Sequence, residues 1–316
     1  MPPAATTTLR LGTRGSLLAR TQSQIVANAV EKAHPGVHVE LVTIRTSGDR
    51  ITDRPLHDVG GKGLFTKEIE QALLSGDVDF AVHSFKDVPV TMPLVDPSGL
   101  VIAAVPERED PRDVLASDGA LTLDALPQGA RVGTGSLRRR CQLLERRPDL
   151  RIEPVRGNID TRLRKLGEGQ YDAIVLAAAG LVRSSLFDHS YMSILEPDVL
   201  LPAPGQGALA LQCRRDDARA RSLLEALNHP DAAECVAAER ALVEAMQGDC
   251  HSPIAALATV KLGRIRVEVA VGARDGAPPV ARTSAGAPRG DTEALVAAVM
   301  TAPFAQAARN LLYPET

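Results

Sequence analysis

The sequence has little aromatic surface: Phe, Tyr and Trp make up 3% of its 316 residues, and Trp is absent. Single-stranded nucleic acids bind proteins largely by stacking their bases on aromatic rings. The composition therefore argues against a nucleic-acid ligand. Leucine, valine, isoleucine and alanine must build the core instead, and a chain of this length, 44% hydrophobic, has ample material for one.

Cysteine is also scarce, and none of the four residues forms a C-x-x-C pair: Cys141, Cys213, Cys235 and Cys250. No histidine cluster has metal-ligand spacing, so we predict neither disulfides nor a metal site. The first residues lack an apolar stretch of signal-peptide length, and no run approaches the ~18 apolar residues of a membrane span. We expect a protein of the reducing cytoplasm that has no membrane partner.

Charge is distributed unevenly along the chain. The formal net charge is -3, yet the segment from Arg131 to Lys165 contains eleven Arg or Lys and four Asp or Glu. A local excess of that size indicates a site for anions.

Strand-like and helix-like segments alternate through about the first 212 residues, which favours parallel sheets with helices on their faces. Residues 1–11 look frayed, and proline-containing crossovers interrupt the pattern at 106–111 and 202–207. The expected strands are 39–44, 78–82, 100–105, 130–133, 173–178 and 208–212, and the expected helices are 16–32, about 65–73, 136–148 and 161–166.

The character of the chain changes after about residue 228. Asp231 and Glu234 form a plausible capping box for a helix that ends near Gly248. Residues 260–271 alternate around Gly263-Arg264, which predicts an antiparallel hairpin, and 292–313 is expected to be helical. The part of the chain after about residue 228 is therefore expected to form an α+β domain.

Arginines gather where a small-residue loop opens a helix, in residues 133–140 (GTGSLRRR). Cations are unfavourable at a helix N-terminus, at about 0.3–1 kcal/mol each, whereas free N–H groups there attract anions. Arg138 and Arg139 are therefore candidates for binding an anion, which would offset their mutual repulsion. The alternative is that both point into solvent, where screening removes most of the cost.

Other arginines follow strands or open helices: Arg14, Arg156, Arg162 and Arg183. Ligands of open α/β sheets bind at strand ends, and arginine pairs with carboxylates through two hydrogen bonds, so a polycarboxylate ligand is indicated. Phosphate is the rival ligand, but the sequence contains neither a P-loop nor a G-x-G-x-x-G motif.

One acidic residue stands out at a strand end, Asp87 in the segment His83-Ser84-Phe85-Lys86-Asp87-Val88-Pro89. An ionised carboxylate among cations can stabilise a developing positive charge and accept N–H bonds from a substrate ring. A surface ion pair with Lys86 is the alternative. His83 is either a general acid or base or a hydrogen-bonded structural residue.

Cys250 differs from the other three cysteines, which fit buried stripes. It follows a helix end between Asp249 and His251, so it is expected in a loop, where nearby arginines favour the thiolate. It is a candidate nucleophile or covalent attachment point.

These features together resemble the porphobilinogen deaminase family over nearly the whole chain. The motifs are residues 14–16 (RGS), 60–65 (GGKGLF), 83–89 (HSFKDVP), 133–139 (GTGSLRR), 156–158 (RGN) with Thr161-Arg162, 177–183, 204–207 (PGQG) and the loop of Cys250. So many motifs in one order are not a chance match.

The resemblance implies a transferase that condenses four porphobilinogen molecules into hydroxymethylbilane, releasing ammonia at each addition. The chain grows on a dipyrromethane cofactor attached by a thioether, here at Cys250. The resemblance makes Asp87 the catalytic residue, which bonds pyrrole nitrogens and stabilises the azafulvenium cation. The acetate and propionate of each pyrrole account for the surplus of arginine.

The remaining site residues are also implied by the resemblance. The cofactor contacts are Ser84, Lys86, Asp87, Thr134, Ser136, Arg138, Arg139 and Gly157. The substrate contacts are Arg14, Ser16, Lys62, Phe65, Arg156, Arg162, Arg183 and Gln206. The family is usually monomeric.

The family fold implies two α/β domains with mixed sheets, similar to type II periplasmic binding proteins, and a smaller α+β C-terminal domain. The expected boundaries are 1–107 with 206–226, then 108–205, then 227–316. Three residues depart from the family pattern: Gly135 replaces a frequent Ser, Asp249 a common Gly and Pro204 a small apolar residue. None removes a reacting group, so an active enzyme is expected.

Two functions of other classes are the alternatives. A binding protein for a small dicarboxylate would explain paired α/β units, but it predicts binding without ammonia release. A nucleic-acid-binding regulator would use the basic segment, but it predicts steeply salt-dependent DNA binding.

Overall fold

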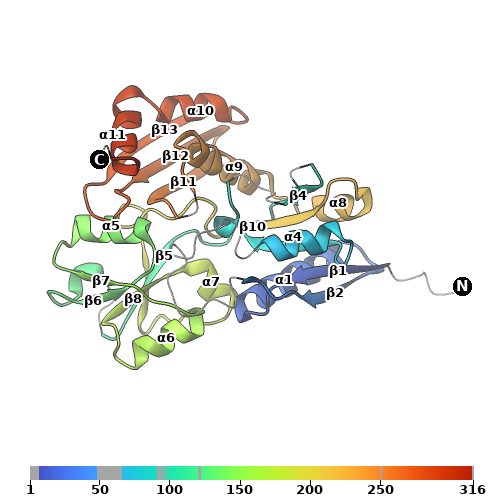
Figure 1. Cartoon of the computed structure of the whole chain (residues 1–316), viewed down its shortest axis with the longest axis horizontal. Coiled ribbons are helices and arrows are strands. Elements are labelled where there is room, and N and C mark those ends of the chain that lie inside the picture. Colours follow the sequence, from blue (N-terminus) through green and yellow to red (C-terminus); the bar gives the residue numbers. More distant parts are fainter. Residues whose placement is uncertain are drawn as a thin grey trace, which may run out of the picture. The chain divides into compact units, whose positions relative to one another are not determined.

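The computed structural model describes residues 7–47, 66–90, 95–96, 98–119, 122–249 and 251–314 (Figure 1). Within them the chain forms two compact units, each of which is described by itself. The first consists of the residues up to Arg108 with Ala208–Ala233, and the second of Glu109–Gly207 with Glu234–Thr316. The three-domain boundaries stay a prediction. No helix in these ranges combines the length and the apolar character needed to cross a membrane.

A mixed five-stranded sheet forms the centre of the first unit, in the order β2-β1-β3-β10-β4. β1 pairs in parallel with β2 and β3, whereas β10 runs antiparallel to β3 and β4. The strands are β1 (Thr7–Thr13), β2 (Val37–Thr43), β3 (Phe80–Ser84), β4 (Leu100–Ala104) and β10 (Leu209–Arg214).

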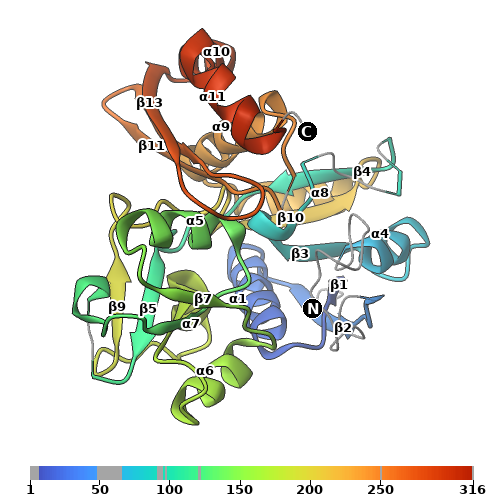
Figure 2. The same ribbon diagram turned by 60° about the vertical axis from the view of Figure 1, so that its left-hand side comes forward.

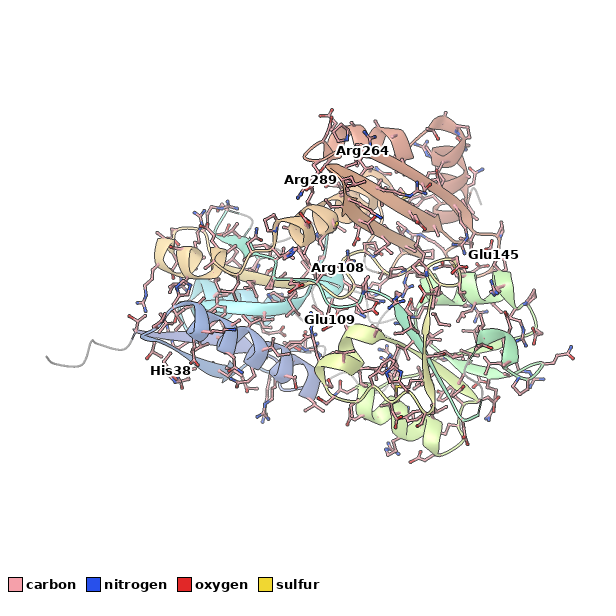
Figure 3. The ribbon with its side chains drawn as sticks, turned by 180° about the vertical axis from the view of Figure 1, so that it is seen from behind. His38, Arg108, Glu109, Glu145, Arg264 and Arg289 are labelled. Atoms are coloured by element: carbon pink, nitrogen blue, oxygen red, sulfur yellow. The ribbon has the colours of Figure 1, made fainter. Side chains whose placement is uncertain are left out.

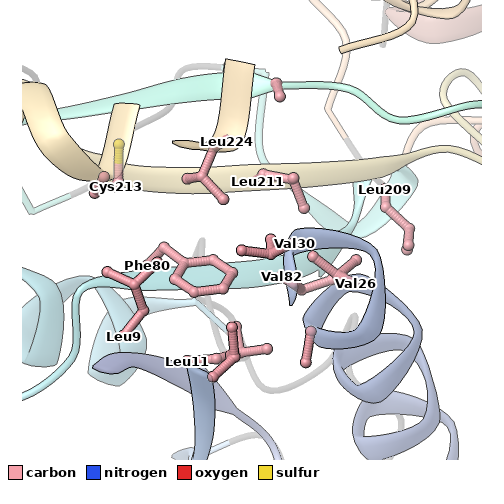
Figure 4. Close-up of a cluster of buried hydrophobic side chains, with 14 residues drawn as sticks. Leu9, Leu11, Val26, Val30, Phe80, Val82, Leu209, Leu211, Cys213 and Leu224 are labelled. Atoms are coloured by element: carbon pink, nitrogen blue, oxygen red, sulfur yellow. The ribbon is translucent and has the colours of Figure 1, made fainter. Parts of the chain in front are cut away.

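Helices cover both faces of this sheet, because successive side chains of a strand point to opposite sides. On one face Phe80 of β3 shares a buried cluster with Val26 of α1 and Leu224 of α8 (Figure 4). On the other face Ala81 shares a cluster with Ile69 of α4. The helices are α1 (Leu17–Ala33), α4 (Lys67–Leu74) and α8 (Ala218–Glu225).

The second unit contains a sheet of the same plan, in the order β7-β6-β8-β5-β9. β6 is parallel to β7 and β8, and β5 is antiparallel to β8 and β9. Leu143 of α5 packs on one face, and Leu166 of α6 with Leu181 of α7 on the other. The elements are β5 (Asp113–Ser117), β6 (Arg131–Gly133), α5 (Leu137–Arg146), β7 (Arg151–Glu153), α6 (Ile159–Gly167), β8 (Ala173–Ala177), α7 (Ala178–Arg183) and β9 (Met192–Leu195).

The repetition of this plan extends to one ion pair in each sheet. In the first sheet Arg10 donates from its backbone N to Asp79 Oδ2 at 2.7 Å, and its Nη2 lies 3.1 Å from Oδ1. In the second, Arg131 N donates to Asp172 Oδ2 at 2.7 Å, and Nη2 lies 3.0 Å from Oδ1. Each aspartate stands just before the third strand of its sheet. The two α/β units therefore share this ion pair as well as the order and direction of their strands.

The C-terminal part of the second unit is a three-stranded antiparallel sheet, β11-β12-β13, next to α10 and α11 (Figure 2). The predicted hairpin is confirmed, but it turns at Leu262 and Gly263, which both have positive φ, one residue earlier than the expected Gly263-Arg264. Glu145 of α5 (Figure 3) accepts from Val280 N at 3.0 Å and pairs with Arg282 of β13 at 3.1 Å. The elements are α9 (Pro230–Ala245), β11 (Ile254–Lys261), β12 (Arg264–Val271), β13 (Ala281–Pro288), α10 (Thr292–Val299) and α11 (Ala302–Leu312).

The predicted fold class is confirmed, with mixed sheets rather than the all-parallel pairing that the strand-helix rhythm alone favours. β10 enters the first sheet from a distant part of the sequence, and β5 pairs with β8 and β9 rather than with the next strand of the chain. Local periodicity therefore carries no signal of their antiparallel direction. Residues 7–11, within the segment expected to be frayed, are instead ordered in β1, which pairs along its whole length with β2 and buries Leu9 and Leu11. Residues 1–6 of that prediction lie outside the described residues.

Two helix-end predictions were also wrong. The first turn of α9 is capped by His229, whose Nδ1 accepts from Ala232 N at 3.2 Å, while Glu234 pairs with Arg289 at 2.8 Å. Pro230 starts the helix earlier than expected, so Asp231 lies inside the first turn. The C-terminal segment is two helices, because Pro303 has no N–H to continue α10.

Gly207 generates a prediction, because it has φ +86° and an added Cβ would lie 2.3 Å from Glu109 O. We expect Gly207→Ala to lower the free energy of unfolding by about 2–4 kcal/mol, through backbone strain and the clash. Gly119 has a similar φ of +85° but nothing within 4 Å of the added Cβ, so Gly119→Ala is the matched control, expected to cost about 1–2 kcal/mol. Denaturant unfolding measures both, and equal losses would contradict the role of the contact.

Candidate active site

The candidate carboxylate lies at the carboxyl end of β3. The strand ends at Ser84 and passes into a 3-10 turn, Phe85–Asp87, in which Val88 N donates to Phe85 O at 3.1 Å. Phe85 is buried and anchors the turn, whereas Asp87 is exposed and has no ion-pair partner among the described residues. The alternative of a surface pair with Lys86 is therefore not supported. The turn presents a carboxylate that a ligand can reach.

Further predicted residues stand at the same edge of the sheet, because β1 is the parallel neighbour of β3. Arg14 follows β1, and Ser16 caps α1 by accepting from Ala19 N at 3.3 Å. Buried Gln22 of α1 donates from Nε2 to Ser84 Oγ at 3.3 Å, which holds the end of β3. The first unit thus assembles five predicted residues: Arg14, Ser16, Ser84, Lys86 and Asp87.

His83 is buried beneath this turn in a chain of polar contacts. Its Nε2 lies 2.9 Å from Gln212 Oε1, and Gln212 Nε2 donates to Glu70 Oε1 at 3.3 Å. Burial lowers the pKa of His83 to about 4, and the charge of Arg14 acts in the same direction against the opposing effects of Gln212 and Asp87. A buried, neutral imidazole matches the structural alternative for His83.

In the second unit, the loop between β6 and α5 is fixed by its own hydroxyls. Thr134 Oγ1 accepts from Ser136 N at 3.2 Å, and Ser136 Oγ accepts from Arg139 N at 3.4 Å as the N-cap of α5. Gly135 between them is exposed. Two of the predicted cofactor contacts are therefore also the groups that position the first turn of α5, and with it the arginines.

Arg138 and Arg139 do not point into solvent, so that alternative is wrong. Their exposed fractions are 5% and 6%, and both meet Asp113, which is fully buried. Arg138 Nη1 lies 2.9 Å from Asp113 Oδ2, and Arg139 Nη2 lies 2.7 Å from Oδ1. Burial alone would raise the pKa of Asp113, but the two guanidinium charges hold it well below its usual range. Burial lowers the pKa of Arg138, and the charge of Asp113 opposes that effect.

The predicted residues around α6 form a local group. Gly157 has φ +109°, and an added Cβ would lie 2.6 Å from Thr161 Cγ2, so a side chain is excluded there. Arg162 donates from Nε to Gly157 O at 2.8 Å, and Lys165 Nζ donates to Arg156 O at 3.3 Å. Arg156 directly precedes this turn, and Arg162 is hydrogen-bonded to it, so the positions of both arginines depend on a backbone conformation that only glycine permits.

Arg183 and Gln206 both contact the crossover regions. Arg183, at the end of α7, donates from Nη2 to Gly207 O at 2.8 Å. Burial lowers the pKa of Arg183, against the charge of Glu109. Gln206 is buried and donates from Nε2 to Pro111 O at 2.7 Å and to Asp113 Oδ1 at 2.9 Å. The crossover is therefore joined to the start of β5.

Lys62, Phe65 and Cys250 lie outside the described residues. The residues flanking Cys250 are described, and Asp249 organises them: its Oδ1 accepts from His251 N and from Ser252 N, both at 2.9 Å. The departure from glycine at this position thus supplies a carboxylate that shapes the loop after α9.

Sequence reasoning missed Asp113 and the partners of His83. Asp113 ends a charged run, 107–113, and directly precedes the apolar residues of β5. A charged residue at the first position of a buried strand was the available signal. Gln212 lies 129 residues from His83 in the sequence and 142 residues from Glu70, so no local pattern identifies these contacts.

The fold and these sites define an α/β protein with a reachable carboxylate at one strand end and clustered arginines at others, an arrangement suited to a ligand that bears carboxylates. The family model described as "Porphobilinogen deaminase, dipyromethane cofactor binding domain" matches residues 9–222, and "Porphobilinogen deaminase, C-terminal domain" matches residues 233–300. The chain belongs to the porphobilinogen deaminase family.

Among solved structures, the chain is similar to the periplasmic VFT2 domain of Bordetella pertussis BvgS, with 16% identity over 70% of this chain and 86% of that chain and a TM-score of 0.38. It is also similar to the effector-binding domain of BenM with its effector benzoate, with 15% identity over 71% of this chain and 91% of that chain and a TM-score of 0.42.

Membership of the family gives the reaction class and the cofactor. The protein is a transferase of tetrapyrrole biosynthesis with hydroxymethylbilane synthase activity, acts on porphobilinogen and uses a dipyrromethane cofactor. The predicted function, cofactor and substrate are confirmed at this level. The individual site residues stay predictions.

We predict that His83→Gln reduces the loss of stability on acidification. The unfolded chain protonates His83 below its ordinary pKa of 6.5, whereas the folded protein keeps it neutral down to about 4. The stability present above pH 6.5 is therefore lost as the pH falls toward 4, at about 1.4 kcal/mol per pH unit and about 3 kcal/mol in all. Glutamine can donate to Gln212 but does not titrate. Urea unfolding at several pH values across this window measures the slope.

His38 provides the control, since its side chain is 60% exposed. His38→Gln is expected to keep the wild-type slope. A wild-type slope in His83→Gln would show that the buried imidazole does not titrate as inferred.

Proposed function

We propose that Asp87 is the catalytic residue for each condensation of porphobilinogen, that Cys250 carries the dipyrromethane primer, and that the arginines hold the acetate and propionate groups of the pyrroles. The observation that carries the proposal is the exposed carboxylate of Asp87, which has no ion-pair partner among the described residues and follows β3 at the sheet edge where Arg14 follows β1. A carboxylate so placed supports binding of a ring N–H rather than a structural ion pair.

The chemistry requires such a group. When the bond between the aminomethyl carbon of porphobilinogen and its nitrogen breaks, the electron pair leaves with ammonia. The ring nitrogen then shares its lone pair with the methylene carbon, so positive charge spreads over the pyrrole. Asp87 can accept a hydrogen bond from the ring N–H and stabilise that charge. A pyrrole carbon attacks the methylene, forms the C–C bond and loses its proton.

The residues of the second unit fit a primer that bears carboxylates. Arg138 and Arg139 face Asp113 as their shared acid, so this group retains one excess positive charge. Buried Arg139 Nε has no hydrogen-bond partner within the described part of the chain. Dipyrromethane held there would supply the free pyrrole carbon to which the first porphobilinogen is joined. We assign its carboxylates to Arg138 and Arg139, with Thr134, Ser136 and Gly157 in the same set.

Cys250 is supported as the attachment point by the state of the other cysteines. Cys141, Cys213 and Cys235 are buried, and burial raises the pKa of Cys141 and of Cys213 to about 11. A buried thiol of high pKa is a poor nucleophile. We assign the thioether to Cys250, the fourth cysteine, whose sequence neighbours Asp249 and His251 are joined by a hydrogen bond from His251 N to Asp249 Oδ1.

We assign the substrate carboxylates to the cations at the strand ends and crossovers, with Ser16, Phe65 and Gln206 as further contacts. Gln206 is included because its side-chain amide donates a hydrogen bond to Asp113 Oδ1. The cationic members are Arg14, Lys62, Arg156, Arg162 and Arg183. We further propose that the protein is cytoplasmic, because a thiol that forms a thioether must stay reduced. We also propose that it is a monomer without a nucleic-acid partner.

Intact-protein mass spectrometry tests the primer. We expect protein made in a tetrapyrrole-producing host to exceed its sequence mass by two linked pyrrole units, and Cys250→Ala to lose that excess. Cys235→Ala is the matched control and is expected to retain it. An unmodified wild-type mass would contradict the assignment of Cys250.

Replacing Asp87 tests the catalytic role. Asp87→Asn keeps the size of the side chain but removes its charge, so we expect kcat for ammonia release to fall about 100-fold or more, with an unchanged unfolding transition. Asp77 is exposed at the opposite end of β3, which makes Asp77→Asn the control with wild-type kcat. Near-normal porphobilinogen consumption by Asp87→Asn would refute the proposal. Saturable binding without ammonia release in the wild type would favour a dicarboxylate-binding protein.

A further inference from the structure

Asp113 lies where three segments of the second unit meet. It is the first residue of β5 and is fully buried. Its Oδ2 is 2.9 Å from Arg138 Nη1, and its Oδ1 is 2.7 Å from Arg139 Nη2 and 2.9 Å from Gln206 Nε2. One carboxylate therefore contacts the first turn of α5 and the crossover before β10 from a position on the central sheet.

Each guanidinium is held at two points. Besides Asp113, Arg138 donates from Nη1 to Leu201 O at 2.6 Å, and Arg139 donates from Nη1 to Val175 O at 2.7 Å. A carboxylate on one side and a carbonyl on another fix the plane and the direction of each group. Arginine presents five N–H donors in a rigid plane, so fixing that plane also fixes the donors that remain.

The charges around Asp113 do not balance. Two guanidinium groups face one carboxylate, and Gln206 adds no charge. A pair that served stability alone would be neutral, because an unmatched buried charge carries a large desolvation cost. The cation that remains, together with the unpartnered Nε of Arg139 in the described structure, indicates that a further anion completes the group.

We propose that Asp113 is the positioning residue that makes Arg138 and Arg139 a binding site for the carboxylates of the primer. It touches the arginines and not the reacting atoms. Its charge offsets one of the two cations, and its two oxygens separate the guanidinium planes so that each can meet a ligand carboxylate. This inference rests on the proposed role of the two arginines.

The pKa of Asp113, held well below its usual range by Arg138 and Arg139, agrees with this role. The Asp113 carboxyl group therefore stays ionised at and around neutral pH. The positioning effect is therefore expected to be independent of pH in that range.

The test uses Asp113→Asn, which keeps the shape but loses the charge, and Asp113→Glu, which keeps the charge but displaces it by one methylene. We expect folded Asp113→Asn to carry primer at less than a tenth of the wild-type occupancy by intact mass. Asp113→Glu is expected to have a reduced occupancy, and its primer-loaded fraction a KM for porphobilinogen at least fivefold higher with a smaller change in kcat. Thermal melting shows that each variant is folded.

Asp172→Asn is the matched control, because Asp172 clamps Arg131 in the same sheet without contacting the first turn of α5. It is expected to melt at a lower temperature yet retain full primer. An equal loss of primer in Asp172→Asn would mean that occupancy follows stability, and it would overturn the inference. Wild-type occupancy and KM in either folded Asp113 variant would overturn it too. If Asp113→Asn does not fold, Asp113→Glu decides by the same criteria.

Arg138→Gln and Arg139→Gln separate this inference from the proposed function. Full primer in both would refute the assignment of the arginines themselves. Loss of primer in both, combined with wild-type behaviour of the Asp113 variants, would leave the proposed function standing and refute only the role of Asp113.

Discussion

The contact between the Asp113 carboxylate and the guanidinium groups of Arg138 and Arg139 organises the charged part of the second unit. Burial would normally neutralise such an acid, but two cations at 2.9 and 2.7 Å keep it ionised. The same oxygens draw in Gln206 and thereby the crossover that leads to β10. The first turn of α5, the start of β5 and the crossover are consequently fixed by one group, and their geometry is a condition for any ligand that the arginines hold.

The two α/β sheets use one plan for opposite chemistry. In both, a strand ends in a small-residue loop and a serine caps the helix that follows, Ser16 on α1 and Ser136 on α5. After the third strand the first sheet presents the exposed carboxylate of Asp87, whereas the second continues into α7 and presents Arg183. A repeated backbone thus places an exposed carboxylate after the third strand of one sheet and an arginine after the third strand of the other, and we propose opposite roles for them, stabilising positive charge and binding negative charge.

Much of the site could be predicted because its residues lie in short local patterns. Asp87 follows a buried strand and precedes Pro89, and Arg138 follows a capped loop, so both patterns can be read within a few residues. The burial of Arg138 and Arg139 could not be predicted, since it depends on Asp113, which is 26 residues away from Arg139. The cap of α9 was missed for a similar reason, because Glu234 accepts a hydrogen bond from Arg289, which lies 55 residues further along the chain.

The sequence by itself determined the α/β class, the strand ends that carry charge and the family, because hydrophobic periodicity and ordered motifs are properties of neighbouring residues. Only the tertiary structure decided the antiparallel direction of β5 and β10, the neutral state of His83 and the pairing of Asp113. Those features depend on contacts between residues far apart in the chain, and on burial, which sets how strongly charges act on one another and has no local signature in the sequence.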